Sequence, residues 1–447
     1  MLNLTNETLM ALARDEITQL GEEGRETTEL QGIIDAAECG DRDEREGLAR
    51  FWELAREAPE RDDFPYEEPD AWEAIQDVCT MDTSGAPLPD EEILHDRIYG
   101  AWLGRCVGCM LGKPIEGRSR AQIRALLEAA DEYPLQDYFP AIENPGDVPY
   151  RDPDDPTLRP NITHSVRDDD TDYTLLGLHL MKTYGGELTS ADVGTEWLQR
   201  LPYMKTYTAE RAAYRNLVFE IPPERTADVL NPYREWIGAQ IRADAFGYCH
   251  PGSPCEAARV AFQDAALSHR MNGIYGEMFF AALIANALVA DAENMEALIH
   301  RSLSFVPPQS RFSEMVRSVV AWCGQDQRWE KTWERISDEY GRYHPVHTIN
   351  NAALVIMGLL HAGGDFEEAI CTTVMGGWDT DCTGATAGSV MGALIGAGGI
   401  PEKWVAPLND TLHSALDGYT VNSIRELASE TVELALALRG DGATKKQ

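Results

Sequence analysis

Along most of the chain, apolar residues recur at spacings of three and four, which places them on one face of a helix. Beyond residue 91 this pattern predicts helices at Ile98–Leu111, Asp172–Tyr184, Glu256–Leu267, Gly276–Ala290, Met295–Phe305, Arg311–Cys323, Asn350–Ala362, Phe366–Met375 and Ile424–Leu438. Alternation of polar and apolar positions, typical of a half-buried strand, is nearly absent. The pattern therefore predicts an all-α fold.

Thr383–Ile400 is an uncharged run of 18 residues in which glycine recurs at every fourth position from Gly384 to Gly396. Glycines at this spacing leave a smooth strip along which a second backbone can lie closely. A transmembrane helix can use the same strip, but this run is rich in Gly and Ala rather than Leu, and it ends at Pro401. We therefore predict a buried central helix of a soluble bundle, and no membrane span.

The first 90 residues differ from the rest in charge. They hold 25 acidic residues and 7 arginines, a net charge of −18, whereas the remaining chain carries −19. Helical stretches at Glu7–Leu20, Glu44–Glu57 and Asp70–Val78 alternate there with Gly, Pro and Asp clusters, and Met81–Asp90 is typical of a linker. We predict that residues 1–90 form an acidic helical N-terminal extension, docked on a catalytic domain of residues 91–440.

Overall charge excludes several classes of function. The 447 residues are 43% hydrophobic, so a large core can form, and 75 acidic against 38 basic residues give a net charge of −37. A phosphate-tracking nucleic-acid binder needs a basic face, and an anionic membrane would repel this chain. The nine cysteines are irregularly spaced and no secretion signal is recognisable, which favours the cytoplasm and free thiols. Cys106 and Cys109 form a C-x-x-C pair without a second pair or a nearby histidine, which favours an ordinary core role.

Two clusters of carboxylates each precede an apolar helix. Arg167-Asp168-Asp169-Asp170-Thr171-Asp172 is the first, and Gly376-Gly377-Trp378-Asp379-Thr380-Asp381-Cys382-Thr383-Gly384 is the second. Crowded carboxylates at a buried helix start are costly unless cations compensate them, and their oxygens select Mg²⁺, Mn²⁺ or Ca²⁺. The first cluster alone fits a surface N-capping run equally well. The second, with its D-x-D turn, favours a binuclear site with oxygen ligands.

These two motifs together resemble the signatures of the ADP-ribosylglycohydrolase family (the dinitrogenase-reductase-activating glycohydrolase group). A third segment, Gly104 to Gly117, resembles the amino-terminal motif of the family, and weaker matches lie at Gly238–Arg242 and Ala265–His269. The matches follow the family order from about residue 95 to 400. Several residues depart from the family pattern, among them Cys382 in place of a threonine, which indicates a divergent branch.

The resemblance implies an orthogonal helical bundle that holds two Mg²⁺ or Mn²⁺ ions in a cleft. Carried over by position, the metal ligands are Asp168, Asp169, Asp170, Asp379, Asp381 and Cys382, with Thr383 as the alternative to Cys382. Glu116 matches the glutamate that assists proton transfer, and Asp169 or Asp170 would position the water. Gly238 and His269 would lie near the ribose or base of the substrate. Trp378 could stack on a base or pack in the core.

Accordingly, the expected function is a binuclear-metal-dependent glycohydrolase, a hydrolase that cleaves a ribosyl N- or O-glycosidic bond of an ADP-ribose conjugate. Its partner would be a small ribosyl molecule or an ADP-ribosylated protein, with no nucleic acid and no membrane. One alternative is a nucleosidase acting on small ribosides with the same metal chemistry. The other is a non-catalytic binding member of the fold.

A few further side chains have two interpretations. His164 could reach the site, but an exposed loop histidine is favoured. His347, Asn350 and Asn351 precede a helix and are expected to cap it rather than to bind substrate. Glu277 is expected to be a first-turn charge of its helix. Arg242 could contact a phosphate, although an ordinary ion pair is the default.

Overall fold

The computed structural model describes residues 4–39, 44–142, 145–146, 148–290 and 294–444. Within these residues the regular structure is almost entirely helical, which confirms the predicted all-α class. The exception is a short antiparallel pair, β1 (Thr411–His413) and β2 (Val421–Ser423), in which Thr411 lies opposite Ser423. No described helix has both the length and the apolar character that crossing a membrane requires. All nine cysteines are free thiols.

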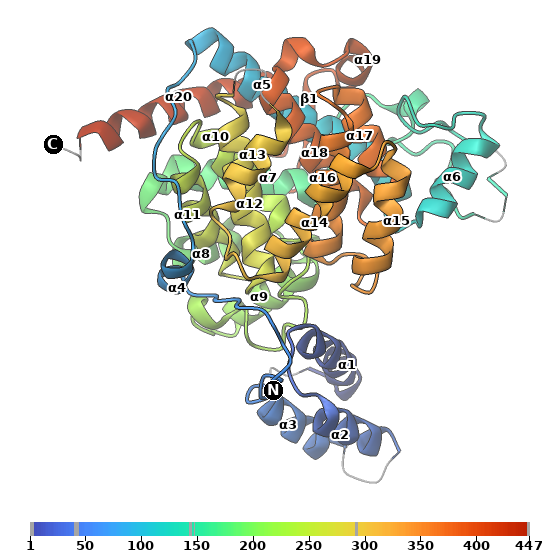
Figure 1. Cartoon of the computed structure of the whole chain (residues 1–447), viewed down its shortest axis with the longest axis vertical. Coiled ribbons are helices and arrows are strands. Elements are labelled where there is room, and N and C mark those ends of the chain that lie inside the picture. Colours follow the sequence, from blue (N-terminus) through green and yellow to red (C-terminus); the bar gives the residue numbers. More distant parts are fainter. Residues whose placement is uncertain (1–3, 40–43, 143–144, 147, 291–293, 445–447) are drawn as a thin grey trace.

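Three helices form a small unit at the N-terminal end, which projects from one end of the main body (Figure 1). They are α1 (Asn6–Glu22), α2 (Thr28–Glu38) and α3 (Glu44–Ala55). We call them the N-terminal unit. Their apolar faces enclose a core of their own, with Leu9, Ile34 and Phe51 almost fully buried, and Leu230 of the main body joins it. The unit therefore closes its core partly against the main body.

The chain then runs along the flank of the main body, past the short helix α4 (Trp72–Val78) (Figure 1). The Glu67 N–H donates to the Gln309 carbonyl at 3.1 Å, and the Ala86 N–H donates to the Gly252 carbonyl at 2.8 Å. These backbone contacts fix the connecting segment to the body along its length.

The main body consists of the remaining helices, many of them close to the bounds that their apolar period predicts. They are α5 (Glu91–Gly112), α6 (Arg120–Ala129), α7 (Asp169–Tyr184), α8 (Ser190–Arg200), α9 (Thr208–Val218), α10 (Ala243–Cys249), α11 (Pro254–Ala265), α12 (Asn272–Ala287), α13 (Met295–Leu303), α14 (Arg311–Gln325), α15 (Trp329–Tyr340), α16 (Thr348–His361), α17 (Phe366–Met375), α18 (Thr380–Ile395), α19 (Glu402–Val405) and α20 (Ile424–Thr444). Short 3₁₀ turns connect several of them.

At the centre of the body, α5 and α18 lie antiparallel with their backbones in direct contact. A Cβ added at Gly104 would lie 2.0 Å from the Gly388 carbonyl oxygen, and one added at Gly108 would lie 1.9 Å from that of Gly384. Only glycine fits such positions. The glycine strip is therefore the seam of two buried helices, as predicted, although α18 ends at Ile395 and not at residue 400.

This antiparallel contact places the end of α5 beside the start of α18. Gly112, the last residue of α5, approaches the carbonyl of Thr380, and the Thr380 hydroxyl donates to the Gly112 carbonyl at 2.9 Å. The first turn of α7 lies against the same end, because Arg105 of α5 donates to the Asp170 carbonyl at 2.9 Å. Both acidic motifs of the sequence thus meet at one end of the central helix pair.

Candidate metal centre

Carboxylates from three helix ends converge in space. Glu116 follows α5, Asp168 and Asp170 open α7, and Asp379 and Asp381 open α18. The two α18 residues lie more than 200 positions after Asp168 and Asp170 in the sequence. We call these five residues the acidic cluster.

Ligand atoms of the acidic cluster and of two neighbouring cysteines form three groups that could each hold a metal ion. They are Cys109 with Asp168 and Asp170, Asp170 with Asp381 and Cys382, and Glu116 with Asp379 and Asp381. Within each group one ligand atom per residue lies within 4.8 Å of the others. Asp170 and Asp381 each belong to two groups, so the three groups adjoin one another.

Two basic side chains oppose this negative charge. Arg105 is fully buried, with its guanidinium 3.0 Å from Asp170 and 2.9 Å from the carboxylate of Asp244. Lys113 forms an ion pair with Asp168. Since Arg105 also neutralises Asp244, these two bases leave the acidic cluster with a net negative charge.

The pKa values of the cluster reflect this imbalance. Burial, followed by neighbouring carboxylates, raises the pKa of Asp381 well above its usual range. Burial also raises the pKa of Asp170 well above that range, although Arg105 opposes the shift, and it raises the pKa of Asp379. Asp168 differs: burial acts in the same direction, but Lys113 outweighs it and the pKa is lowered. Carboxylates in this environment are costly to ionise without a cation.

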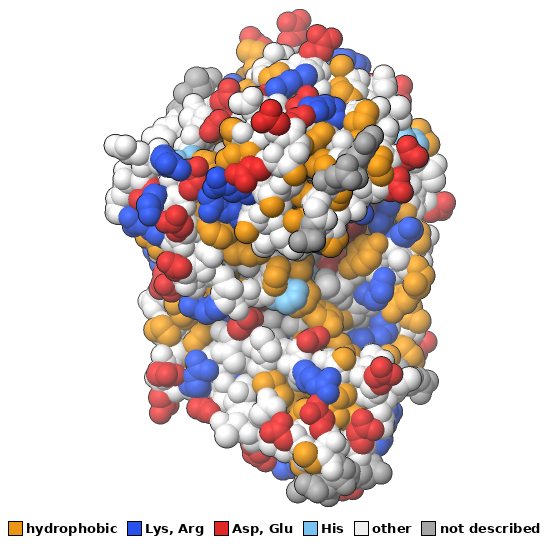
Figure 2. All heavy atoms as spheres, turned by 90° about the vertical axis from the view of Figure 1, so that its right-hand side faces the viewer, with side chains coloured by type: hydrophobic (Ala, Val, Ile, Leu, Met, Phe, Trp, Pro, Cys, Tyr) orange, Lys and Arg blue, Asp and Glu red, His pale blue; other side chains and the backbone are white. Residues whose placement is uncertain are grey.

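The cluster reaches the surface at Glu116. This residue is exposed, whereas the other four acids are almost fully buried. Although the residue is exposed overall, partial burial of its carboxyl, and then the charges of Asp379 and Asp168, raise the pKa of Glu116. The segment that carries it leads into α6, whose side of the molecule is the face shown in Figure 2; acidic, basic and apolar side chains are mixed there.

The loop before α18 is held from two sides. The Gly117 N–H donates to the Trp378 carbonyl at 2.9 Å, and the Trp378 N–H donates to the Arg118 carbonyl at 3.1 Å. From α16, the Asn351 side-chain oxygen accepts a hydrogen bond from the Asp379 N–H at 3.2 Å. A Cβ at Gly377, which has a φ of +84°, would lie 2.8 Å from the Arg118 carbonyl, so this close approach needs glycine. These contacts fix the direction in which Asp379 points.

Not every residue expected at the metals lies in a ligand group. Asp169 is half-buried and belongs to none of the three groups, although its neighbours on both sides do. Cys382 does belong to one, and burial followed by the surrounding carboxylates raises the pKa of its thiol well above the usual range. Thr383 instead donates from its hydroxyl to the Asp379 carbonyl at 2.9 Å.

Two of the expected substrate residues lie around Arg242 rather than in the acidic cluster. The Arg242 guanidinium is buried and paired with Glu210 at 2.6 Å, so the default ion-pair interpretation holds. A Cβ at Gly238 would lie 2.1 Å from the Glu210 carboxylate. His269 is fully buried with Nδ1 2.8 Å from the Ser268 hydroxyl, and burial, then the charge of Arg242, lower its pKa well below the usual range. Trp378, in contrast, directly precedes Asp379 and is half-buried.

The structure corrects two smaller expectations. The N-cap of α16 is His347, whose ring accepts from the Ile349 N–H, while Asn350 and Asn351 lie inside the first turn. Asn351 holds the Asp379 loop instead of capping the helix. Glu277 is not a solvated first-turn charge: it is fully buried, 3.6 Å from Arg242.

Cys109 is the ligand candidate that sequence reasoning missed. The C-x-x-C spacing of Cys106 and Cys109 was interpreted as an ordinary core pair. The informative spacing is the recurrence of Arg105, Cys109 and Lys113 at every fourth position, because residues four apart share one face of a helix. That face of α5 is the one that contacts Asp168 and Asp170.

Comparison with known proteins gives three findings. Residues 90–441 match the sequence model of the ADP-ribosylglycohydrolase family. An uncharacterised protein of Archaeoglobus fulgidus is 24% identical over 352 residues, which is 77% of this chain and 99% of that protein. A solved ADP-ribosylglycohydrolase-related protein complex is similar in structure, at 20% identity and a TM-score of 0.46, over 77% of this chain and 98% of that one.

Proposed function

This chain belongs to the ADP-ribosylglycohydrolase family, and from that premise we propose that it is a binuclear-metal-dependent hydrolase that cleaves the ribosyl bond of an ADP-ribose conjugate. One observation carries the proposal: five carboxylates from the ends of α5, α7 and α18 share a small volume, and among the described residues only Arg105 and Lys113 form ion pairs with them. Divalent cations account for that crowding better than any role of the acids in packing.

The donor set fits Mg²⁺ or Mn²⁺. Carboxylate oxygens predominate in all three ligand groups, and such hard ligands suit these ions. We propose that Asp168, Asp170, Asp379 and Asp381 would hold two ions. Cys109 and Cys382 would lie beside the ions as neutral thiols, which are poor ligands for hard cations. Asp169, half-buried at the edge, would contact an ion or its water from outside.

Metal ions in this position would hold hydroxyl groups of the ribose and polarise a water molecule. The remaining work falls to the side chains. Departure of the leaving group passes through an oxocarbenium-like state, which carboxylates nearby stabilise by their charge. Glu116, exposed and with a raised pKa, is suited to carry a proton at the mouth of the site. Asp169 and Asp170 would orient the water.

Arginine at the mouth favours a substrate with a diphosphate. Arg151 donates to the Lys113 carbonyl at 2.7 Å and to that of Pro114 at 3.1 Å, which places its charge beside Glu116. Because a nucleoside carries no anionic group, such an arginine would add nothing to its binding. We therefore place ADP-ribose conjugates before free nucleosides, and the nucleosidase and non-catalytic alternatives become outcomes of the test.

The experiment compares metal content and hydrolysis in the wild type, Asp379→Asn and the control Asp338→Asn, which changes an exposed acid of α15. Substrates are ADP-ribosyl amino acids, O-acetyl-ADP-ribose and nucleosides, each with Mg²⁺ or Mn²⁺. We expect the wild type and the control to bind two ions and hydrolyse an ADP-ribose conjugate, and Asp379→Asn to lose an ion and nearly all turnover.

Other outcomes reject specific parts of the proposal. Full activity of Asp379→Asn with both ions bound would refute the metal assignment. Hydrolysis of nucleosides alone would select the riboside alternative. A wild-type protein that is folded, takes up neither metal and hydrolyses none of the substrates would support a binding role.

A further inference from the structure

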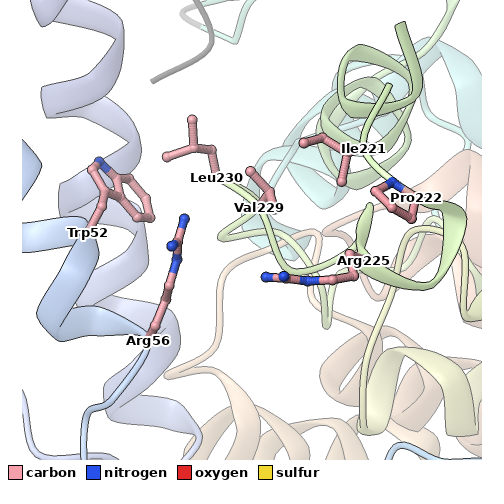
Figure 3. A pocket seen from close by; sticks show the side chains of 7 residues that line it. All are labelled: Trp52, Arg56, Ile221, Pro222, Arg225, Val229 and Leu230. Atoms are coloured by element: carbon pink, nitrogen blue, oxygen red, sulfur yellow. The ribbon is translucent and has the colours of Figure 1, made fainter. Parts of the chain in front are cut away.

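A hollow of about 390 Å³ lies where the N-terminal unit meets the main body (Figure 3). Trp52 and Arg56 form one wall. The loop of residues 221–230 forms the other, through Ile221, Arg225, Val229 and neighbours. None of these residues belongs to the acidic cluster, so the hollow is separate from the candidate metal centre.

Both walls are fixed by contacts outside the hollow. Trp52 is 7% exposed and belongs to the core of the N-terminal unit, as does Leu230 from the opposite wall. Asn216 of α9 donates to the Val229 carbonyl at 2.7 Å, and Arg215 donates to the Leu230 carbonyl at 2.8 Å. The hollow is therefore formed in advance of any ligand, which reduces the entropy that binding would cost.

Its charged side chains are two arginines that face the same space. Figure 3 shows the Arg56 guanidinium rising between the walls and that of Arg225 pointing toward it. Among the described residues, neither guanidinium has an acidic partner or a side-chain hydrogen bond, although acidic residues outnumber basic ones 75 to 38 in this chain. Both arginines are exposed, so solvent screens their mutual repulsion, and an anion between the two guanidinium groups would interact with both.

From this arrangement we infer that the hollow is a binding site for a small amphipathic anion, a carboxylate or phosphate group attached to an apolar body. The two guanidinium groups hold the anionic head in a forked, hydrogen-bonded geometry. Trp52, Ile221 and Val229 cover the apolar body, which gains from leaving water. Because the ligand contacts both walls, its binding also ties the N-terminal unit to the main body.

A fluorescence titration of the full chain with anilinonaphthalene sulfonate, an aromatic anion, tests the site. The variants are Arg56→Gln and Arg225→Gln, with Arg50→Gln as the matched control. Arg50 is an exposed arginine of the same helix as Trp52 but does not line the hollow. Competitors are octanoate and octyl phosphate, which carry the two kinds of head, with octanol and acetate as the apolar and anionic parts alone.

We expect saturable binding at one site per chain, weakened about tenfold in each of the two hollow variants and unchanged in Arg50→Gln. Octanoate, octyl phosphate or both should displace the probe, and the competitor with the higher affinity shows whether the site prefers a carboxylate or a phosphate head group. Octanol and acetate should not. Circular dichroism checks that every variant is folded.

Three outcomes would overturn the inference: absence of saturable binding, equal affinity in all three variants and the wild type, or displacement by octanol as effective as by octanoate. None of these outcomes depends on hydrolytic activity or on bound metal, so the experiment tests this inference independently of the proposed function.

Discussion

Replacing Gly108 by alanine tests whether the α5–α18 contact controls both stability and the metal centre. The new Cβ would lie 1.9 Å from the Gly384 carbonyl oxygen, against the 3.4 Å at which ordinary contact begins, so the two helices would have to separate by up to 1.5 Å. The obstacle is backbone of a buried helix, which has no rotamer to change. We expect a loss of about 3 kcal/mol in the free energy of unfolding, at the upper end of the usual cost of overpacking.

The matched control is Gly324→Ala in α14, where the added Cβ meets nothing within 4 Å. It should gain up to about 1 kcal/mol from the higher helix propensity of alanine. Urea unfolding followed by circular dichroism measures both variants, and Mn²⁺ titration measures whether separating α5 from α18 also weakens the centre at their ends. A Gly108→Ala protein as stable as the control would refute the reasoning, because the close approach would then not exist.

Three further predictions concern other parts of the fold. Burial, and then the charge of Glu235, raise the pKa of Glu22 to about 8, against 4.5 in the unfolded chain. Between these two values the folded state holds a proton that the unfolded state has lost, so the free energy of unfolding falls as the pH rises. Glu22→Gln should reduce this fall between pH 5 and pH 8.5, by at most about 1.4 kcal/mol per pH unit. Arg311→Met leaves the buried carboxylate of Glu235 without its partner at 2.7 Å, and should cost about 3–5 kcal/mol in urea unfolding. Asn351→Ala removes the acceptor for the Asp379 N–H, and should weaken Mn²⁺ binding by about 10- to 100-fold in calorimetric titration.

Each of these has a result that contradicts it. Equal slopes of stability against pH for Glu22→Gln and the wild type would reject the raised pKa. Arg311→Met should cost far more than Arg328→Gln, which breaks an exposed pair with Glu330, and equal losses would reject the buried network. Unchanged Mn²⁺ affinity in Asn351→Ala would show that the loop is held without that hydrogen bond.

The apolar period was sufficient to predict the buried helices of the fold. Phe366–Met375 was predicted to the residue and α16 to within two residues, whereas the prediction for α12 began four residues late and ended three residues late. The surface helix α15 was missed, although Trp329, Trp333, Ile336 and Tyr340 recur along it at helical spacing. For α8 a readable signal was overlooked: Thr189 and Asp192 form a capping box.

The two acidic motifs could be found in the sequence. That they lie close together in space could not be derived from the glycine strip of Thr383–Ile400 alone, because the strip does not say which helix packs against it. A matching strip, from Gly100 to Gly112 at every fourth position, was also present in α5, and pairing the two strips would have predicted the seam. The pairing of Lys113 with Asp168 and the hold of Asn351 on Asp379 could not be predicted, because they depend on which helix ends become neighbours in three dimensions.

Because the acidic cluster joins Asp168 and Asp170 to partners more than 200 positions later in the chain, the four-carboxylate set proposed for two ions is complete only when α18 has docked beside α5 and α7. Both proposed ions could be held together only after the central helices have docked. Cation uptake would then report on completed folding, and a chelator added to the finished protein would lower its melting temperature without having blocked its assembly.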